Sequence, residues 1–443
     1  MKKNYILLVL VLLMIIPGCT PGNGSNPIPE LSSSLKAITS FSLNGVVGTI
    51  NETGKTIAVT MPFGTDVTAM VATFTTNGAS VKVGETIQVS GTTVNNFTNQ
   101  VTYTVTAADA TTQDYVVTVT PAAGTKVTFT ADGVSFKMAY VPGGLSFPLR
   151  NSDSDHATVA SAYWIAETVV TYELWYAVKT WAAANNYTFA NSGAEGSDGT
   201  AGAAPTTNKN QPVTTVNWRD AMVFTNALTE WYNAKNGTNY TCVYYVDSSY
   251  TTPIRNVDTV STVSCCPTGT GCSTSCSTPD GTEDNPYIKA DATGFRLLGS
   301  NEYELAARYK GSDSTNGAIP YPTGSGYFWT PGNYASGATA YAYDLTGSDN
   351  PNLAPTHAVA WFSQSGTEDV GKLVANTLGL YDMSGNVFAW NSDWFAGQIG
   401  FGRIMRGSSW FRGAFYTQLG YVFGTNPHNA SDEIGFRLSR TDL

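Results

Sequence analysis

The feature that most constrains this chain is its C-terminal stretch from Leu378 to Leu438, which is dense in Trp, Tyr and Gly. It contains the runs LGLYDMSGNVFAWNSDWF and RIMRGSSWFRGAFYTQLGYVFGTNPHNASDEIGFRL. Closely spaced glycines favour turns over helix interiors, and large aromatic residues need a core to pack against. The pattern therefore indicates an irregular, loop-rich fold rather than a helical bundle.

Three separated fragments of this stretch, LGLYDMSGNV, RGSSW and IGFRL, resemble the signature of the formylglycine-generating-enzyme (sulfatase-modifying factor) family. They occur in the family's order and spacing. The earlier segments PVTTVNWRDAMVFTNAL and GFRLLGSNEYELAARYKG also parallel family segments, so the resemblance covers roughly residues 136–440. It implies a C-type-lectin-like fold for most of the chain.

The N-terminus has the features of an export signal. Two lysines precede an apolar run from Tyr5 to Ile16, and Cys19 follows directly after a glycine. This arrangement resembles a bacterial lipobox, which implies cleavage before Cys19 and lipidation of that residue. We therefore expect a signal peptide at 1–18, a flexible Pro-, Gly- and Ser-rich tether at 19–34, and a lipid-anchored protein at the outer membrane or cell surface. An ordinary signal peptide or a short anchor is the alternative.

Residues 35–122 alternate between apolar and polar with a period of two. Val101 to Thr106 and Tyr115 to Thr120 show the alternation most clearly, and the polar turn between them predicts a β-hairpin. Several other short runs of the same kind predict a small all-β, immunoglobulin-like sandwich. It has no evident catalytic group, so we expect a spacer, with a binding role as the alternative.

The remaining residues, 126–443, are expected to form an α+β domain of the C-type-lectin-like, formylglycine-generating-enzyme type. A first helix is predicted at 172–184, with apolar residues on one face. A second is predicted to be capped by Asn217 and ended by Gly237. A third has Gly299 at its N-cap, where the family has Thr, and keeps Glu302 as the reciprocal capping residue.

Five cysteines remain after Cys19, which is an odd number. In an exported protein they are expected to form two disulfides and leave one thiol, although the pairing cannot be read from the sequence. A zinc site in the clustered cysteines is the alternative. The five residues are Cys242, Cys265, Cys266, Cys272 and Cys276.

The residue types at the family's reactive positions argue against enzymatic activity. The resemblance places the two reactive cysteines of the copper-using members at Arg412 and Thr417. Neither residue can serve as a thiolate nucleophile or as a soft copper ligand. The three histidines of the chain are widely spaced and include no pair suited to an iron site. We therefore expect no catalytic residues and no formylglycine-generating activity.

The family's calcium-binding run, G-N-x-W-E, corresponds here to the segment from Gly385 to Ala389. Ala389 replaces the glutamate, so a hard-cation site loses its charged ligand. A second family site corresponds to the region of Asn333 and Tyr334. We expect no metal and no resident cofactor, with bound calcium as the alternative.

Positions after RGSSW depart from the asparagine-rich family pattern in a particular way. Each of the replacing residues can be reached from an Asn codon by changing only adenines. This is similar to the variable proteins of diversity-generating retroelements, most closely the Treponema variable protein. The resemblance implies a fixed scaffold with a hypervariable ligand-binding region at about 385–438. The candidate ligand-binding residues are Phe411, Arg412, Gly413, Phe415, Tyr416, Phe423, Gly424, His428 and Asp432, with Phe388, Ala389 and Asn391 as a second patch.

We therefore expect a surface lipoprotein that recognises a protein or glycan ligand on another cell or a host. Its net charge of −10 provides no basic surface for nucleic acid, and the membrane is expected to be contacted only through the N-terminal lipid. The alternatives are a fixed adhesin or carbohydrate- or protein-binding module, a purely structural lipoprotein, and a formylglycine-generating-type oxidoreductase. Joint exposure of the aromatic candidates would favour ligand binding, and burial of most of them would count against it.

Overall fold

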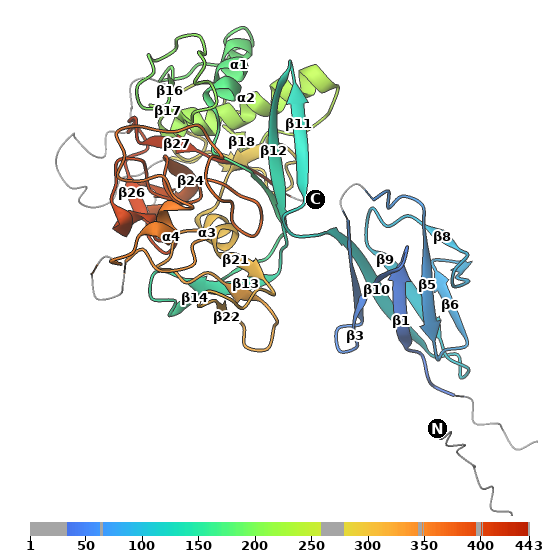
Figure 1. Ribbon diagram of the computed structural model, residues 1–443. Helices are drawn as coiled ribbons and strands as arrows, with labels where there is room; N and C mark the ends of the chain where they lie inside the picture. The colour runs from blue at the N-terminus through green and yellow to red at the C-terminus, as the bar shows by residue number, and fades with distance from the viewer. Residues whose placement is uncertain are drawn as a thin grey trace, which may run out of the picture. The chain divides into compact units, whose positions relative to one another are not determined.

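The computed structural model describes residues 33–62, 65–257, 279–343, 348, 350–395, 400 and 402–441. The expected signal peptide, lipidation site and most of the tether lie outside these ranges, as do four of the five later cysteines. The fifth, Cys242, is a buried free thiol. No helix within the described ranges is long and apolar enough to cross a membrane. The chain divides into two compact units, whose main boundary lies at residues 119–120 (Figure 1).

The first unit consists of two β-sheets that share a core, which confirms the predicted all-β sandwich. Their strand orders are β2-β1-β5-β8 and β3-β4-β10-β9-β6-β7. Tyr103 of the second sheet contacts Phe41 and Phe74 of the first, with ring centroids 5.3 and 5.9 Å away. The strands are β1 Ile38–Leu43, β2 Val46–Val47, β3 Thr49–Asn51, β4 Thr56–Met61, β5 Met70–Thr76, β6 Ser80–Val83, β7 Thr86–Ile87, β8 Val94–Asn95, β9 Val101–Thr106 and β10 Thr112–Pro121. The predicted hairpin is the antiparallel pair β9 and β10.

The second unit is built on a five-stranded sheet with the order β11-β12-β15-β28-β20. Its central pairing joins the beginning of the domain to its end, since Tyr163 of β15 lies opposite Thr441 of β28. The loops between these strands therefore all begin and end on one rigid base. The strands are β11 Lys126–Ala131, β12 Val134–Val141, β15 Tyr163–Ala166, β20 Phe295–Leu297 and β28 Leu438–Thr441.

Two longer helices pack against this base. They are α1 Tyr172–Ala183 and α2 Trp218–Asn236, close to the predicted bounds. The side chain of Asn217 accepts from the amide of Asp220 at 2.9 Å, and the Asp220 carboxylate accepts from the Asn217 amide at 3.2 Å, so the cap is reciprocal. Gly237 ends the helix with φ +66°, a conformation that glycine adopts without strain.

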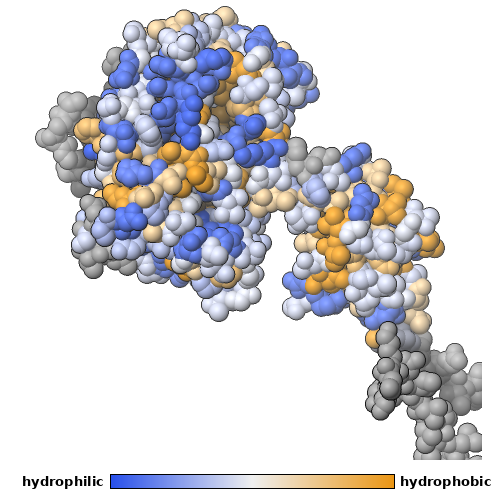
Figure 2. Space-filling model, in the orientation of Figure 1, coloured by the Kyte–Doolittle hydropathy of each residue, from blue (hydrophilic) through white to orange (hydrophobic). Residues whose placement is uncertain are grey.

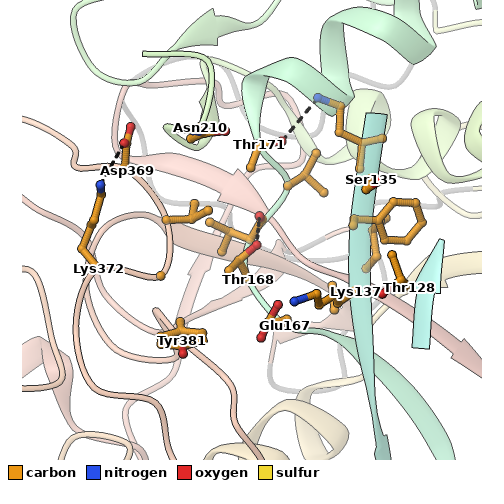
Figure 3. A pocket seen from close by; sticks show the side chains of 18 residues that line it. Thr128, Ser135, Lys137, Glu167, Thr168, Thr171, Asn210, Asp369, Lys372 and Tyr381 are labelled. Atoms are coloured by element: carbon orange, nitrogen blue, oxygen red, sulfur yellow. Dashed lines mark hydrogen bonds and ion pairs between the residues drawn. The ribbon is translucent and has the colours of Figure 1, made fainter. Parts of the chain in front are cut away.

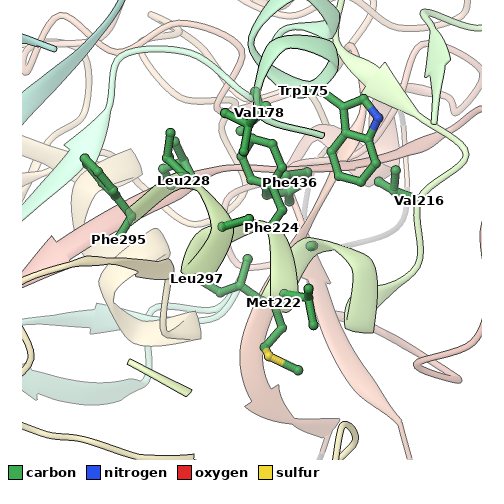
Figure 4. Packing of buried hydrophobic residues seen from close by; sticks show 14 of the residues in the cluster. Trp175, Val178, Val216, Met222, Phe224, Leu228, Phe295, Leu297 and Phe436 are labelled. Carbon is green, nitrogen blue, oxygen red and sulfur yellow. The ribbon is translucent and has the colours of Figure 1, made fainter. Parts of the chain in front are cut away.

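Aromatic residues join these helices to the C-terminal strands (Figure 4). Trp175 of α1 stacks on Phe224 of α2 with centroids 5.1 Å apart, and Phe224 meets the ring of Phe436 edge-on at 5.2 Å. All three side chains are buried. Burial of such side chains stabilises a fold by about 1.5–3 kcal/mol each, so this cluster fixes the end of the chain against the helices.

A second sheet is formed almost entirely by the C-terminal stretch. Its order is β26-β25-β24-β27, in which β24 and β27 are parallel and the other pairs are antiparallel. β24 is an interior strand, with β25 on one side and β27 on the other. The strands are β24 Phe388–Trp394, β25 Arg403–Arg406, β26 Phe423–Thr425 and β27 Ile434–Phe436.

The rest of the unit consists of short elements joined by long loops, as the density of glycine and aromatic residues predicted. The helical elements are α3 Ser300–Arg308, α4 Ala354–His357 and the 3₁₀ turn η2 Ala414–Thr417. The small sheets are formed by β13 Leu145–Leu149 with β14 Asp155–Val159, β16 Ala194–Glu195 with β17 Val213–Thr214, β18 Tyr244–Tyr245 with β19 Tyr287–Ile288, and β21 Tyr309–Gly311 and β22 Ile319–Pro320 with β23 Phe328–Trp329.

Candidate ligand-binding site

The loop between β25 and β26 carries most of the candidate residues, and buried groups anchor it at several points. The buried guanidinium of Arg406 donates to the carbonyls of Leu419 and Tyr421 at 3.0 and 3.1 Å. The indole nitrogen of Trp410 donates to the carbonyl of Asp432 at 3.1 Å. These contacts fix the backbone of the loop, and they leave other side chains free to face the solvent.

Phe411 and Phe415 project from this anchored loop. Phe411 is 60% exposed and Phe415 is 36% exposed. Phe415 contacts Tyr416 and Tyr421 nearly at right angles, with centroids 5.3 and 5.4 Å away, and the two tyrosine rings are 5.1 Å apart. We call the group Phe411, Arg412, Phe415, Tyr416 and Tyr421 the aromatic face.

Arg412 is held in place within the aromatic face rather than left mobile. Its guanidinium donates two hydrogen bonds to the carboxylate of Glu433, at 2.8 and 3.0 Å. It also lies 5.8 and 5.9 Å from the ring centroids of Phe411 and Tyr416, within range of cation–π attraction. The side chain is 38% exposed, so the arginine presents a fixed, partly accessible charge beside the rings.

Three further candidates lie outside the aromatic face. Phe423, on the edge strand β26, is 36% exposed and packs against the buried ring of Phe388. Asp432 is exposed. His428 is half-buried, and its Nε2 lies 3.0 Å from the guanidinium of Arg219. Burial, assisted by that positive charge, lowers the pKa of His428 below its ordinary value.

The prediction of a second ligand-binding patch is wrong. Phe388, Ala389 and Asn391 are 3%, 1% and 0% exposed, so they form part of the core. The reason is that both faces of β24 are covered, since Phe388 packs in the hydrophobic cluster that contains Phe436 and Ala389 packs in the one that contains Tyr303. The position of Gly424 also argues against a free ligand-contacting role, because a Cβ there would lie 2.2 Å from Cγ of Phe395. By contrast, Gly413 is exposed and has nothing within 4 Å of the place of a Cβ.

The structure adds three residues that the sequence did not single out. Tyr421 belongs to the aromatic face, and Tyr343 meets the ring of Phe415 at 4.9 Å. Glu433 orients Arg412 and also accepts from the hydroxyl of Ser409 at 2.6 Å. Tyr421 carries the same adenine-codon signal as its neighbours, whereas nothing in the sequence marks Tyr343 or Glu433.

The positions of the family's reactive cysteines are integrated into other contacts. Arg412 pairs with Glu433, and the buried hydroxyl of Thr417 donates to the carbonyl of Ala414 at 2.8 Å. In the segment that corresponds to the family's calcium-binding run, the side-chain amide of Asn386 donates to the carbonyl of Glu368 at 3.0 Å. Within the described part of the chain, no three His, Cys, Asp or Glu side chains are grouped so that they could hold a metal ion.

At the second expected calcium position, main-chain groups are also engaged. The carbonyls of Asn333 and Tyr334 accept from the amides of Ala342 and Leu419, at 3.2 and 2.9 Å.

A separate pocket of about 500 Å³ lies between the β11–β12 hairpin, the start of α1 and the loop at 369–372 (Figure 3). Its wall carries charges of both signs, including an ion pair between Lys372 and Asp369 with 3.3 Å between nitrogen and oxygen. None of the candidate ligand-binding residues lines it.

Fold and site together define a lectin-like α+β domain that presents an exposed aromatic loop. Residues 126–442 match the family described as the sulfatase-modifying factor enzyme 1-like domain, and the chain belongs to this family. Its fold is therefore the expected C-type-lectin-like fold, preceded by an all-β domain. Residues 38–119 match the family described as SGBP, N-terminal.

The chain is also similar to individual proteins. It is 24% identical over 319 residues to the chaperone protein LppX of Paenibacillus barcinonensis, covering 70% of this chain and 90% of that protein. Among solved structures, the Treponema denticola variable protein 1 is 26% identical, with 72% of this chain and 99% of that chain covered and a TM-score of 0.47. CarF is 23% identical, with 71% and 100% covered and a TM-score of 0.46.

Proposed function

We propose that the second unit is a ligand-binding module whose contact surface is the aromatic face together with Phe423. One observation carries the proposal. Among the described residues, the phenylalanines with a third or more of their surface exposed are Phe411, Phe415 and Phe423, and all lie within this one stretch. Because exposing a phenylalanine forfeits burial free energy, a group of three within one short stretch of sequence is better explained by recognition than by packing.

Other exposed apolar residues differ in kind. Hydrophobic residues gather in several patches on the face shown in Figure 2, in both units. In the first unit the exposed ones include Val47, Ile87 and Val94, which are aliphatic and lie on short strands at sheet edges. Aromatic rings and arginine dominate interface energies, and rings held on a scaffold lose little conformational entropy on binding. The aromatic face fits this description, whereas the aliphatic edges do not.

The finer proposal is that the contact residues are diversified and that the protein is displayed on a membrane by a lipid on Cys19. The adenine-codon pattern supports the first part, and the lipobox-like N-terminus supports the second. We also propose that the domain is not an enzyme, because Arg412 and Thr417 replace the reactive cysteines. The alternative is a fixed adhesin with the same contact surface. The curated relative named as a chaperone is compatible with recognition of protein surfaces.

The test is a binding measurement with a defined probe. Peptides from a phage-displayed random library are selected on the full chain, and their Kd values are measured for variants by surface plasmon resonance. Phe411→Ala combined with Phe415→Ala is expected to weaken binding at least tenfold, about 1.4 kcal/mol or more, with an unchanged melting temperature. Val374→Ala is the matched control, since Val374 is 62% exposed but lies outside the stretch. Equal binding by the double variant and the control would contradict the proposal.

A further inference from the structure

We propose that a groove beside the aromatic face is a distinct binding site for a neutral oligosaccharide. The groove has a volume of about 910 Å³, in the upper part of the range of small-molecule pockets. Its walls come from the loop after β13, the start of α3, the end of β24 and the segment before β26. Its lining includes Arg150, Ser152, Asn301, Asp393, Trp394 and Tyr421.

A second hollow adjoins the groove. That hollow has a volume of about 390 Å³, and Asp393 and Trp394 line both spaces. Asn285 and Trp218 are among the residues on its far side. The two hollows therefore adjoin across a shared wall, which suits a ligand of several units rather than a single small molecule.

Aromatic side chains give the groove apolar surfaces. Trp394 is held by the guanidinium of Arg403, which lies 3.7 Å from its ring centroid and 3.8 Å from that of Trp218. This sandwich fixes the indole before any ligand arrives. Tyr421 and Phe395 line the same groove. Flat apolar surfaces of this kind pack against the C–H faces of sugar rings, and a fixed ring loses little entropy on binding.

The charges at the groove are compensated by protein groups. Glu304 and Arg406 pair with each other, and the guanidinium of Arg150 pairs with Asp155 at 2.6 Å. The carboxylate of Asp393 accepts from the amide of Ser300, the first residue of α3. The charged side chains of the lining are two cations, Arg150 and Arg406, and two anions, Glu304 and Asp393. Because these charges balance, the groove favours no ion of either sign, and a neutral ligand fits it better.

Uncharged polar groups remain available for hydroxyls. Among the described residues, the exposed side-chain amide of Asn301 makes no hydrogen bond, and it can donate and accept. The hydroxyl of Ser152 is paired only with that of Ser154, at 2.8 Å, and is exposed. Fixed rings flanked by neutral donors and acceptors are the chemistry that recognises a neutral sugar chain.

The inference goes beyond the proposed function. Three groove residues, Gly420, Tyr421 and Val422, come from the loop between β25 and β26, whereas Arg150, Ser152, Asn301 and Trp394 lie outside it. The groove is therefore expected to keep its specificity when Phe411, Arg412, Phe415 and Tyr416 change, because none of them lines it.

The test uses isothermal titration calorimetry of the full chain with hexasaccharides of glucose, xylose, mannose and N-acetylglucosamine, and with an acidic hexagalacturonate. We expect one neutral probe to bind with one-to-one stoichiometry and to change the tryptophan fluorescence. Asn301→Ala combined with Ser152→Ala is expected to weaken binding about tenfold, as the loss of one to two hydrogen bonds predicts.

Two controls separate this site from the aromatic face. Asn236→Ala changes a comparable exposed helical asparagine of α2, away from the groove, and is expected to bind normally. Phe411→Ala is also expected to bind the sugar normally. Failure of every neutral probe at millimolar concentration, tighter binding of hexagalacturonate, or unchanged affinity in the Asn301 and Ser152 double variant would each overturn the proposal.

Discussion

Gly413 and Gly435 lie in the same C-terminal stretch but in opposite surroundings. A Cβ on Gly435 would lie 2.6 Å from the carbonyl oxygen of Val213, whereas one on Gly413 would meet nothing within 4 Å. We predict that Gly435→Val destabilises the domain by about 2 kcal/mol or more, as overpacking does, and that Gly413→Val leaves the melting temperature unchanged. Thermal unfolding followed by circular dichroism measures both. Equal melting temperatures for the two variants would show that Gly435 is not a closely packed position of the fold.

We expect His428 to make the stability of the domain depend on pH. Its folded-state pKa is lowered by burial and by Arg219, with Asp284 and Glu283 acting in the opposite direction. A base whose folded-state pKa is lowered binds a proton more readily in the unfolded state. The neutral imidazole's contribution to the free energy of unfolding is therefore complete above the unfolded pKa near 6.5, and it is lost as pH falls through the folded pKa. We predict that wild type loses more stability between pH 7.5 and 5 than His428→Gln. Urea unfolding at each pH measures this, and identical slopes would contradict it.

The candidate residues differ in whether the sequence predicted their exposure correctly. The aromatic candidates after RGSSW are exposed or half-exposed, as expected. Loop position alone does not decide this, since Trp410 and Leu419 of the same loop are buried. Phe388 and Ala389 are buried because separate hydrophobic clusters cover the two faces of β24. The residues that form these clusters are distant in the sequence, so the local pattern of the strand does not reveal them. Tyr343 joins the site from a distant loop, which only the folded chain reveals.

Among the elements, α3 shows how a missing cap can be replaced from elsewhere. Gly299 has no capping side chain, but the carboxylate of Asp393 accepts from the amide of Ser300, and Glu302 accepts from the amide of Gly299 at 2.8 Å. We predict that Asp393→Ala destabilises the domain by about 1 kcal/mol. Guanidinium unfolding monitored by tryptophan fluorescence measures this.

A second substitution tests the cause of that loss. Gly299 has extended backbone angles, and a Cβ there would lie no closer than 3.4 Å to other atoms. Gly299→Thr supplies a local cap and is expected to restore most of the stability of Asp393→Ala. No restoration would mean that Asp393 stabilises the domain by something other than capping the helix.

The longer elements were predictable because each carries its own signal. The caps Asn217 and Gly237 and the apolar periodicity between them determine α2, and the alternation of Val101–Thr106 determines β9. Two-residue strands such as β16 and β18 have no such signal, since their pairing depends on distant partners. The pairing of the clustered cysteines stays a prediction, because they lie outside the described residues.

For the whole molecule, we propose that a lipid on Cys19 attaches the β-sandwich and the lectin-like domain to a membrane. We predict that wild type, expressed with its full N-terminus in a lipoprotein-processing bacterium, partitions into the detergent phase of Triton X-114, because acyl chains add about 0.8 kcal/mol per buried methylene. Cys19→Ser is expected to move it to the aqueous phase. Incorporation of labelled palmitate is the second readout, and labelling or detergent partitioning that survives the substitution would contradict lipidation at Cys19.

The most direct test of ligand binding through a diversified surface is deep sequencing of the 3′ end of the gene from one clonal culture, together with a search of flanking DNA for a near-copy. The account predicts substitutions at the codons of Phe411, Arg412, Gly413, Phe415, Tyr416 and Phe423, at positions that match adenines in the copy, and none at Trp410 or Gly435. A uniform 3′ end without a near-copy would contradict diversification and leave the aromatic face as a fixed binding surface.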